Sequence, residues 1–147
     1  MKPKVNVDKT SVRYLAQGVK FLGHGFYRAK GLCSPTVHSR PKEKLKQKLK
    51  GWCGHFGFAR YEKWARKTDE WIRRRIRQLL WKMWKRVRTR YAALRKLGSS
   101  EEQAYQWANT RKGSWRIAHS WILTTTLTND FLKAQGWCWL SMYGVKG

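Results

Sequence analysis

The residues best suited to chemistry in this sequence are cations set beside tryptophans. Eleven Lys and Arg residues lie between positions 73 and 96 without one Asp or Glu, and Trp71, Trp81 and Trp84 lie in or beside this run. Written as a helix, the run places like charges at i,i+4 spacing, and each such pair costs about 0.2 to 0.5 kcal/mol. A polyphosphate backbone would relieve this repulsion and release its counterions. The run therefore indicates an anionic partner.

The residue pattern does not indicate a catalytic site. Two-metal phosphoryl transfer needs clustered carboxylates, whereas the acids here are two pairs at expected helix starts and four solitary residues. The four histidines lack i,i+4 spacing and a Cys pair, so they do not form a zinc motif. No nucleophile elbow or phosphate-binding glycine loop is present in the sequence. We therefore expect no enzyme activity, no catalytic residue, no cofactor and no metal site.

The overall charge favours nucleic acid as the partner. The formal net charge is +25, distributed as +11 over residues 1–50, +12 over residues 51–98 and +2 over residues 99–147. Because 41% of the residues are apolar and ten are tryptophans, the chain can bury a core and is not a disordered tail. We expect a basic binding face over the first two thirds and a packing module in the last third.

A membrane or secreted protein fits the sequence poorly. No stretch approaches 18 uninterrupted apolar residues, and no apolar signal region follows the first lysines. Cys33, Cys53 and Cys138 fit neither a disulfide framework nor a metal knuckle, so we expect reduced thiols. The cytoplasm and no membrane partner are the expectations; a basic helix lying on anionic lipid is the weaker alternative.

The local patterns predict a mainly α (α+β) fold. A short N-terminal β-hairpin is expected from the apolar residues 19–27 and 33–38, with a turn at Lys30-Gly31. A short cationic helix is expected over residues 42–50, and an aromatic, Gly-rich element follows over residues 51–67. After these elements we expect the remaining helices of a basic, Trp-rich bundle of about four to five helices.

The helix boundaries of this bundle are predicted from capping residues. Thr68 is the expected N-cap of a helical run, either one kinked helix or two helices, that Gly98 ends. Ser99 and Glu102 have the spacing of a capping box for the next helix. A final helix is expected from Ser120 to Gly136.

The cations are expected to share the face opposite the apolar stripe of the long helix. Trp81 falls among them, and two interpretations remain: it stacks on an unpaired base, or it packs against another helix. A second group of cations follows the helix break near Gly113. The candidate nucleic-acid-binding residues from both groups are Arg73, Arg74, Arg75, Arg77, Trp81, Lys82, Lys85, Arg86, Arg88, Arg90, Arg111, Lys112, Trp115 and Arg116.

Several long words in a fixed order make the sequence similar to a known family. They are VNVDKT at 5–10 with FLGHGF at 21–26, DEWIRRR at 69–75 continuing through WKMWK at 81–85 to residue 90, and ANTRKGSWRIAHS at 108–120. On these words the chain resembles the C-terminal part of a bacterial group II intron reverse transcriptase/maturase. The resemblance implies that the first words close the polymerase palm, and that the later words form the thumb and the maturase-specific domain.

The same resemblance implies the domain organisation and the partner. Residues 1–40 would be a remnant of the palm end, and residues 41–147 an abridged thumb with the maturase-specific helical domain, because residues 39–50 are shorter than the family's usual thumb segment. The implied function is binding of structured group II intron RNA to assist splicing, without the catalytic Asp pair of the reverse transcriptase.

Two other functions remain open from the sequence. The chain could be a basic accessory protein for other structured RNA or for DNA. It could also be one part of a split reverse transcriptase whose palm and fingers lie on a separate chain.

Overall fold

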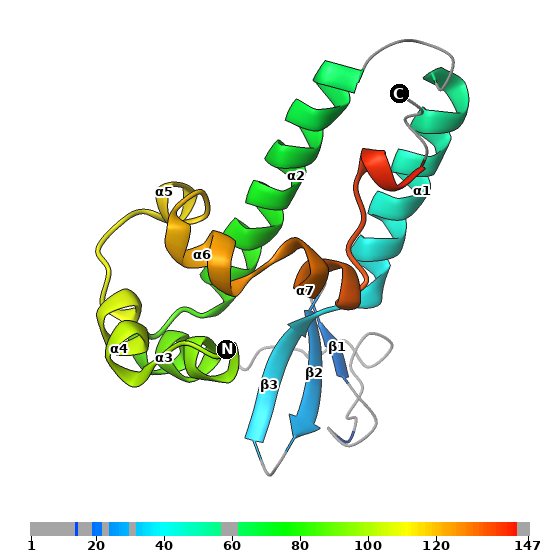
Figure 1. Cartoon of the computed structure of the whole chain (residues 1–147). Helices are drawn as coiled ribbons and strands as arrows, with labels where there is room; N and C mark the ends of the chain where they lie inside the picture. The colour runs from blue at the N-terminus through cyan, green and yellow to red at the C-terminus, as the bar shows by residue number, and fades with distance from the viewer. Residues whose placement is uncertain (1–13, 15–18, 22–23, 30–31, 57–61, 144–147) are drawn as a thin grey trace, which may run out of the picture. The chain divides into compact units, whose positions relative to one another are not determined.

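The chain forms two compact units, Met1–Pro41 and Lys42–Gly147 (Figure 1). The computed structural model describes residues 14, 19–21, 24–29, 32–56 and 62–143. Most of these residues are helical, which confirms the predicted mainly helical class. The predicted division at residue 40 and the assignment of each part to palm, thumb and maturase domain stay predictions.

The first unit contains short extended segments. Strands β1 (Val19–Phe21), β2 (His24–Ala29) and β3 (Leu32–Val37) are antiparallel neighbours in the order β1-β2-β3. His24 pairs with Phe21 on one side and with Val37 on the other. The Lys30-Gly31 turn of the predicted hairpin lies outside the described residues, so the hairpin stays a prediction.

The second unit is a chain of helices joined by short turns. Seven α-helices and one 3₁₀-helix occur in the described residues: α1 (Ser39–Phe56, which starts at the unit boundary), α2 (Glu62–Met83), α3 (Val87–Lys96), α4 (Glu101–Ala108), α5 (Ser114–Ile117), α6 (Trp121–Thr126), α7 (Asn129–Ala134) and η3 (Leu140–Tyr143). The prediction of four to five helices was too low because α5 was not expected, the run that Gly98 ends is divided, and so is the expected final helix. Thr128 interrupts it and caps α7 by accepting a hydrogen bond from the Phe131 amide.

The long basic helix begins earlier than its sequence predicts. α2 starts at Glu62, so the expected N-cap Thr68 lies inside the helix. Near residues 84–86 the helix ends, and Arg90 Nε donates to the freed Trp84 carbonyl at 2.9 Å. Of the two predicted alternatives, one kinked helix or two helices, the structure has two helices, α2 and α3. The helical wheel drawn across residue 84 therefore does not apply beyond it.

Two of the predicted helix ends are confirmed and one is shifted. Gly98 and Gly136 adopt φ values of 91° and 81°, and this left-handed backbone suits glycine after a helix. Ser100, not Ser99, is the N-cap of α4 and accepts from the Gln103 amide at 3.3 Å. Ser99 is buried instead, with no hydrogen-bond partner for its hydroxyl.

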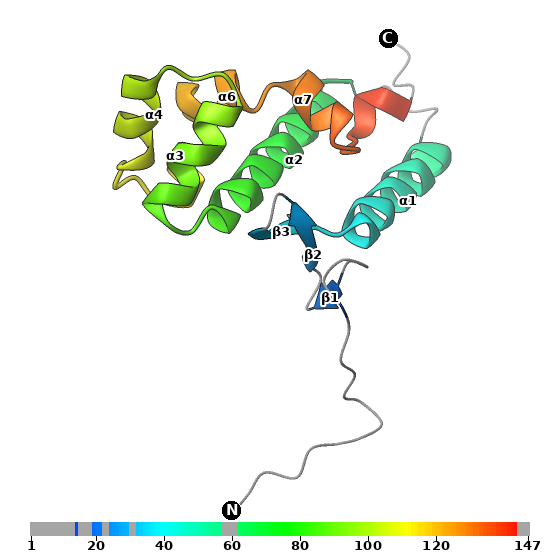
Figure 2. The ribbon, with the colours of Figure 1, turned by 90° about the horizontal axis from the view of Figure 1, so that it is seen from below.

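Two neighbouring clusters of buried side chains lie in the described part of the second unit. Trp81 of α2 packs with Ile117, Leu123 and Leu127, so residues around α5 and α6 cover the C-terminal half of α2. Leu94 of α3 packs with the two alanines of α4, and Figure 2 shows these helices side by side. Trp84 borders both clusters, so it links the α2–α6 packing to the α3–α4 pair.

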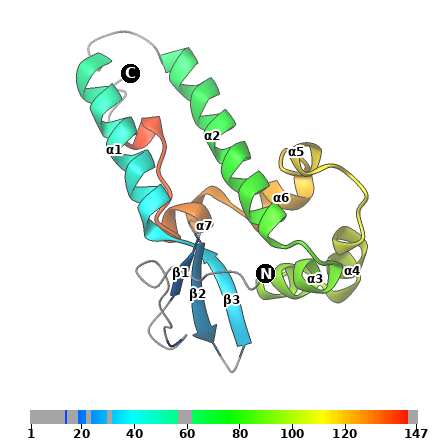
Figure 3. The same ribbon diagram turned by 180° about the vertical axis from the view of Figure 1, so that it is seen from behind.

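The C-terminal segment is held between α1 and α2, as Figures 1 and 3 show. Asp69 of α2 is 1% exposed and accepts the backbone amides of Leu140 and Ser141 at 2.6 and 2.9 Å. Cys53 of α1 donates weakly to the Leu140 carbonyl at 4.0 Å. A carboxylate in mid-helix thus caps a 3₁₀-helix some 70 residues later in the chain.

Candidate nucleic-acid interface

Helix α2 positions most of the predicted binding residues, and it is buried on two sides. Ile72 and Ile76 are buried on one face. Arg77 and Trp81, one turn apart, are buried on another. The apolar stripe read from the sequence therefore accounts for only part of the packing. Cations between these two faces remain in contact with solvent.

Trp81 does not lie on the cationic surface. Its side chain is 1% exposed and belongs to the core formed with Ile117, Leu123 and Leu127. Arg90 covers the ring, with its guanidinium carbon 4.6 Å from the ring centroid. The interpretation that Trp81 stacks on an unpaired base was wrong. The interpretation that it packs within the domain is confirmed.

Arg77 is also buried, at 8% exposure. Its Nε donates to the Leu127 carbonyl at 3.0 Å, and one terminal nitrogen donates to Asn129 Oδ1 at 3.1 Å. Burial lowers the pKa of the guanidinium, and the neighbouring Arg73 charge lowers it further. The predicted free cationic face therefore does not include Arg77 as a solvated member.

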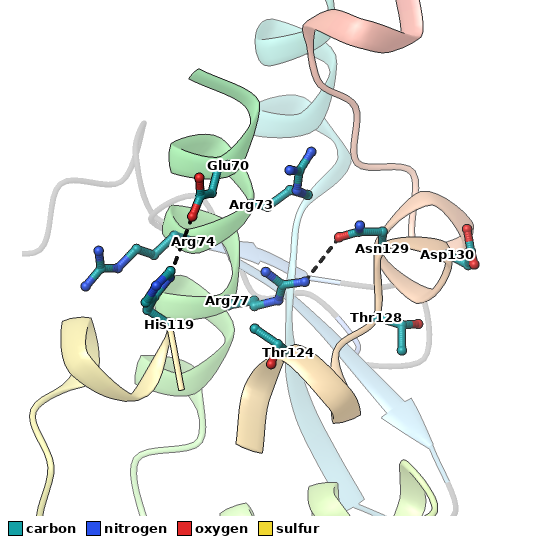
Figure 4. A pocket seen from close by; sticks show the side chains of 9 residues that line it. All are labelled: Glu70, Arg73, Arg74, Arg77, His119, Thr124, Thr128, Asn129 and Asp130. Atoms are coloured by element: carbon teal, nitrogen blue, oxygen red, sulfur yellow. Dashed lines mark hydrogen bonds and ion pairs between the residues drawn. The ribbon is translucent and has the colours of Figure 1, made fainter. Parts of the chain in front are cut away.

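A pocket of about 550 Å³ opens beside these arginines (Figure 4). Arg73 and Arg77 lie on its α7 side, whereas Arg74 points to the other side of α2. Its lining residues come from α2, the α5–α6 turn, α6 and the start of α7: Glu70, Arg73, Arg74, Arg77, His119, Thr124, Thr128, Asn129 and Asp130. The Arg73 and Arg77 guanidinium groups and two threonines on this side of α2 are donors suited to a phosphate.

The two acids of the pocket have partners other than the arginines. Glu70 Oε1 lies 4.0 Å from His119 Nδ1, and Asp130 Oδ1 lies 3.5 Å from Lys133 Nζ. Among the described residues, no ion pair joins an arginine of the pocket to a carboxylate. Arg73 and Arg77 thus lie close together without an acidic partner, and an anion would reduce their repulsion.

A second cluster joins α2 to α5 through stacked arginines and tryptophans. The Arg74 guanidinium carbon is 3.9 Å from the Trp115 ring centroid, and that of Arg75 is 5.8 Å from the same centroid and 5.6 Å from the Trp71 centroid. We call this set, Trp71, Arg75, Trp115 and Arg74, the Arg–Trp ladder. Its members are separated by up to 44 positions in the chain and are assembled by the packing of α5 on α2.

The remaining predicted residues between positions 73 and 90 differ in their contacts and in their exposure to solvent. Arg73 lies over the Trp139 ring at 5.4 Å, and Arg90 is held by Trp84 and Trp81. The other four side chains are exposed to solvent: Lys82, Lys85, Arg86 and Arg88. Because α2 ends at Met83, Lys85, Arg86 and Arg88 lie beyond it and do not continue the face that Arg74 occupies.

The second predicted group lies around the turn between α4 and α5. Arg111, Lys112 and Arg116 are exposed, and Trp115 is 37% exposed between Arg74 and Arg75. Trp115 therefore connects this group with α2.

Several lining residues were missed by sequence reasoning. Asn129 and Thr128 begin α7, and Thr124 belongs to α6; the only local signal is that small polar residues flank a helix start. Trp71 was noticed as an aromatic beside the basic run, but it was not selected as a site residue. Its i,i+4 spacing to Arg75 is the signal that could have identified it.

The structure gives no indication of a membrane-spanning or metal-binding site in its described part. None of the helices there combines the length and the apolar composition needed to cross a bilayer. No group of three or more His, Cys, Asp or Glu side chains is arranged there to hold a metal ion.

Comparison with known proteins identifies the helical region. Residues 39–98, which cover α1, α2 and α3, match the family model described as the group II intron maturase-specific domain. A search of curated proteins finds no match. The family match confirms the resemblance inferred from the sequence words, and it includes residues 39–50, which the sequence analysis assigned to an abridged thumb.

Proposed function

We propose that the chain, whose residues 39–98 match the family model of the group II intron maturase-specific domain, binds structured group II intron RNA and assists its splicing. The RNA would bind along α2 and α3, with additional contacts from the α4–α5 turn. We place this function in the cytoplasm. No polymerase activity of this chain is part of the proposal, because the matched domain is the maturase-specific one.

The observation that supports RNA binding most directly is the absence of acids from the cationic run. Residues 73–96 hold eleven Lys and Arg residues and no carboxylate. The acids immediately before the run are otherwise engaged: Asp69 is buried on the amides of η3, and Glu70 faces His119. The protein itself therefore offers this surface little neutralising charge, and a polyphosphate would supply it.

The pocket beside Arg77 is the proposed position for one backbone phosphate. Arg77 is buried with one carbonyl and one amide oxygen as partners, and Arg73 is the nearby like charge. A phosphate would accept hydrogen bonds from the Arg73 guanidinium, and the buried charge of Arg77 would attract it without direct contact. Such contacts fix the RNA in position without reading its sequence.

The salt dependence of binding tests the proposed function. If roughly six phosphates are neutralised, the affinity for a folded group II intron RNA should fall about a thousandfold between 50 and 200 mM salt. Filter binding of the full chain at several salt concentrations measures this slope. A flat response would show that the basic run does not contact phosphates.

Matched variants and competitor nucleic acids make the test specific. Arg88→Ala should reduce the salt slope by about one, the contribution of one phosphate contact. Lys133→Ala removes a cation that is already paired with Asp130, so it should reduce the slope less. Duplex DNA that binds as tightly as intron RNA, with the same slope, would instead support a basic accessory nucleic-acid-binding protein.

A further inference from the structure

The Arg–Trp ladder has a fixed geometry that the proposed phosphate contacts do not require. Arg74 Nε and Nη2 donate to the Trp115 carbonyl at 3.4 and 3.2 Å. Arg74 therefore contacts both the ring and the backbone of Trp115. Arg75 donates to Gln78 Oε1 at 2.9 Å, and Gln78 Nε2 donates to Ser114 Oγ at 3.3 Å. These bonds fasten the start of α5 to α2 and set the spacing between the rings.

The tryptophans of the ladder present ring surface to solvent. Trp71 is 55% exposed and Trp115 is 37% exposed. Arg75 lies between the two rings and is itself exposed. An indole that remains in water beside unpaired cations offers a flat apolar surface and a positive charge at the same point.

A groove of about 370 Å³ continues from Trp71 along α2. Its floor is apolar, and its two charged lining residues, Arg75 and Lys82, are both cations. The occupant must therefore combine a flat or apolar part with negative charge. Ile72, Ile76 and Trp137 belong to its apolar floor.

We propose that Trp71, together with Arg75 and the adjoining groove, forms a stacking site for one or two unpaired bases of RNA. A nucleotide has the required chemistry, because its base can stack on the indole while its phosphate meets the guanidinium. A base-paired duplex keeps its bases within the helix, so the site would select single-stranded segments. This inference rests on the proposed RNA-binding function and adds a preference for unpaired bases to it.

A tryptophan outside the ladder provides a matched control. Trp121 is 64% exposed and meets Trp107 edge to face at 5.4 Å. In the part of the chain that the structure describes, no Lys or Arg lies over the Trp121 ring. Trp121→Ala therefore removes an equally exposed indole that has no cation beside it.

The experiment compares a single-stranded RNA with a duplex RNA of equal phosphate number. Trp71→Ala should weaken binding of the single strand by about tenfold or more and leave duplex binding within about twofold. Trp71→Phe, which retains a stacking ring, should recover most of the loss, and Trp121→Ala should behave as the wild type. A 2-aminopurine base in the single strand should change its fluorescence on binding the wild type, and less on binding Trp71→Ala.

Several results would overturn the stacking site. Equal losses for single strand and duplex, or equal effects of Trp71→Ala and Trp121→Ala, would assign Trp71 a general structural role. Competition by polyglutamate as effective as that by RNA of equal charge would show that charge alone is recognised. If the wild type binds duplex RNA with the expected salt slope but shows no Trp71 effect, only this inference fails; if it binds no RNA, the proposed function fails with it.

Discussion

Three residues of α2 differ in exposure from what the sequence around them suggests. Trp81 lies in a cationic stretch of sequence but fills the core, whereas Trp71, two residues before the start of the stretch, keeps half of its surface in water. Arg77 is charged yet buried, and its donors satisfy the Leu127 carbonyl and Asn129. Exposure, and not residue type, separates the side chains that can meet a ligand from those that hold the fold.

The buried position of Arg77 leads to a prediction about stability. Arg77→Ala should lower the free energy of unfolding by about 2 to 4 kcal/mol, because it leaves the Leu127 carbonyl without its donor and opens a space beside α6 and α7. Lys85→Ala and Arg88→Ala, both at exposed positions, should each change it by less than about 0.5 kcal/mol. Urea unfolding followed by circular dichroism measures all three.

RNA affinity provides the complementary measurement for these variants. Lys85→Ala and Arg88→Ala should weaken binding to all RNAs alike while they keep the stability of the wild type. If Arg77→Ala proves as stable as the wild type, the hydrogen bonds to Leu127 and Asn129 do not contribute to the fold as the geometry indicates.

At the scale of the elements, α2 acts as the support on which the C-terminal segment is fixed. Asp69 lies in the interior of α2, where its carboxylate accepts the first two amides of η3. Trp137, Trp139 and Leu140 are buried as this segment docks. One carboxylate thus takes the capping role that helix ends require, although it belongs to another helix.

This arrangement predicts that Asp69 is worth more to stability than other acids of the chain. Asp69→Ala leaves two amide donors unsatisfied and should cost about 2 to 5 kcal/mol, and Asp69→Asn, which keeps one carbonyl oxygen, should cost less. Thermal and urea unfolding measure the differences. Asp130→Asn is the matched control, since Asp130 is 92% exposed, and it should change stability by less than about 0.5 kcal/mol.

Proteolysis locates the effect of the Asp69 variants. Loss of the cap should release η3 and make the chain after Gly136 the first to be cleaved by a limiting amount of protease. A variant that loses stability but keeps the wild-type cleavage pattern would show that Asp69 acts elsewhere than on η3.

At the scale of the whole molecule, the helical unit combines a small core with a large excess of positive charge. The formal net charge of +25 opposes compaction, and ion pairs among the described residues relieve little of it. A bound polyanion would therefore be expected to stabilise the fold as well as occupy the surface.

The whole chain also predicts the outcome of a polymerase assay. Template, primer, nucleotides and magnesium should give no extended product with this chain alone, because its acids do not form a two-metal site. An active reverse transcriptase assayed under the same conditions is the positive control. Incorporation that disappears when an acid of this chain is replaced would contradict the prediction, and activity that requires an added palm fragment would indicate a split polymerase.

The sequence by itself determined the mainly helical class and the resemblance to maturases, and it predicted an anionic partner. These conclusions depend on local or additive quantities: apolar periodicity, capping glycines such as Gly98 and Gly136, net charge, and words of consecutive residues. The sequence also placed Trp115 among the candidate residues, because it lies within a recognised word.

Only the tertiary structure decided which of these side chains are free. Arg77 meets Leu127 across 50 positions, and Asp69 meets Leu140 across 71. The same kind of distant packing covers Trp81 with α5 and α6 and brings Trp115 onto Arg74. A helical wheel of α2 contains no information about these partners, because burial and hydrogen bonding depend on segments that approach the helix from elsewhere in the chain.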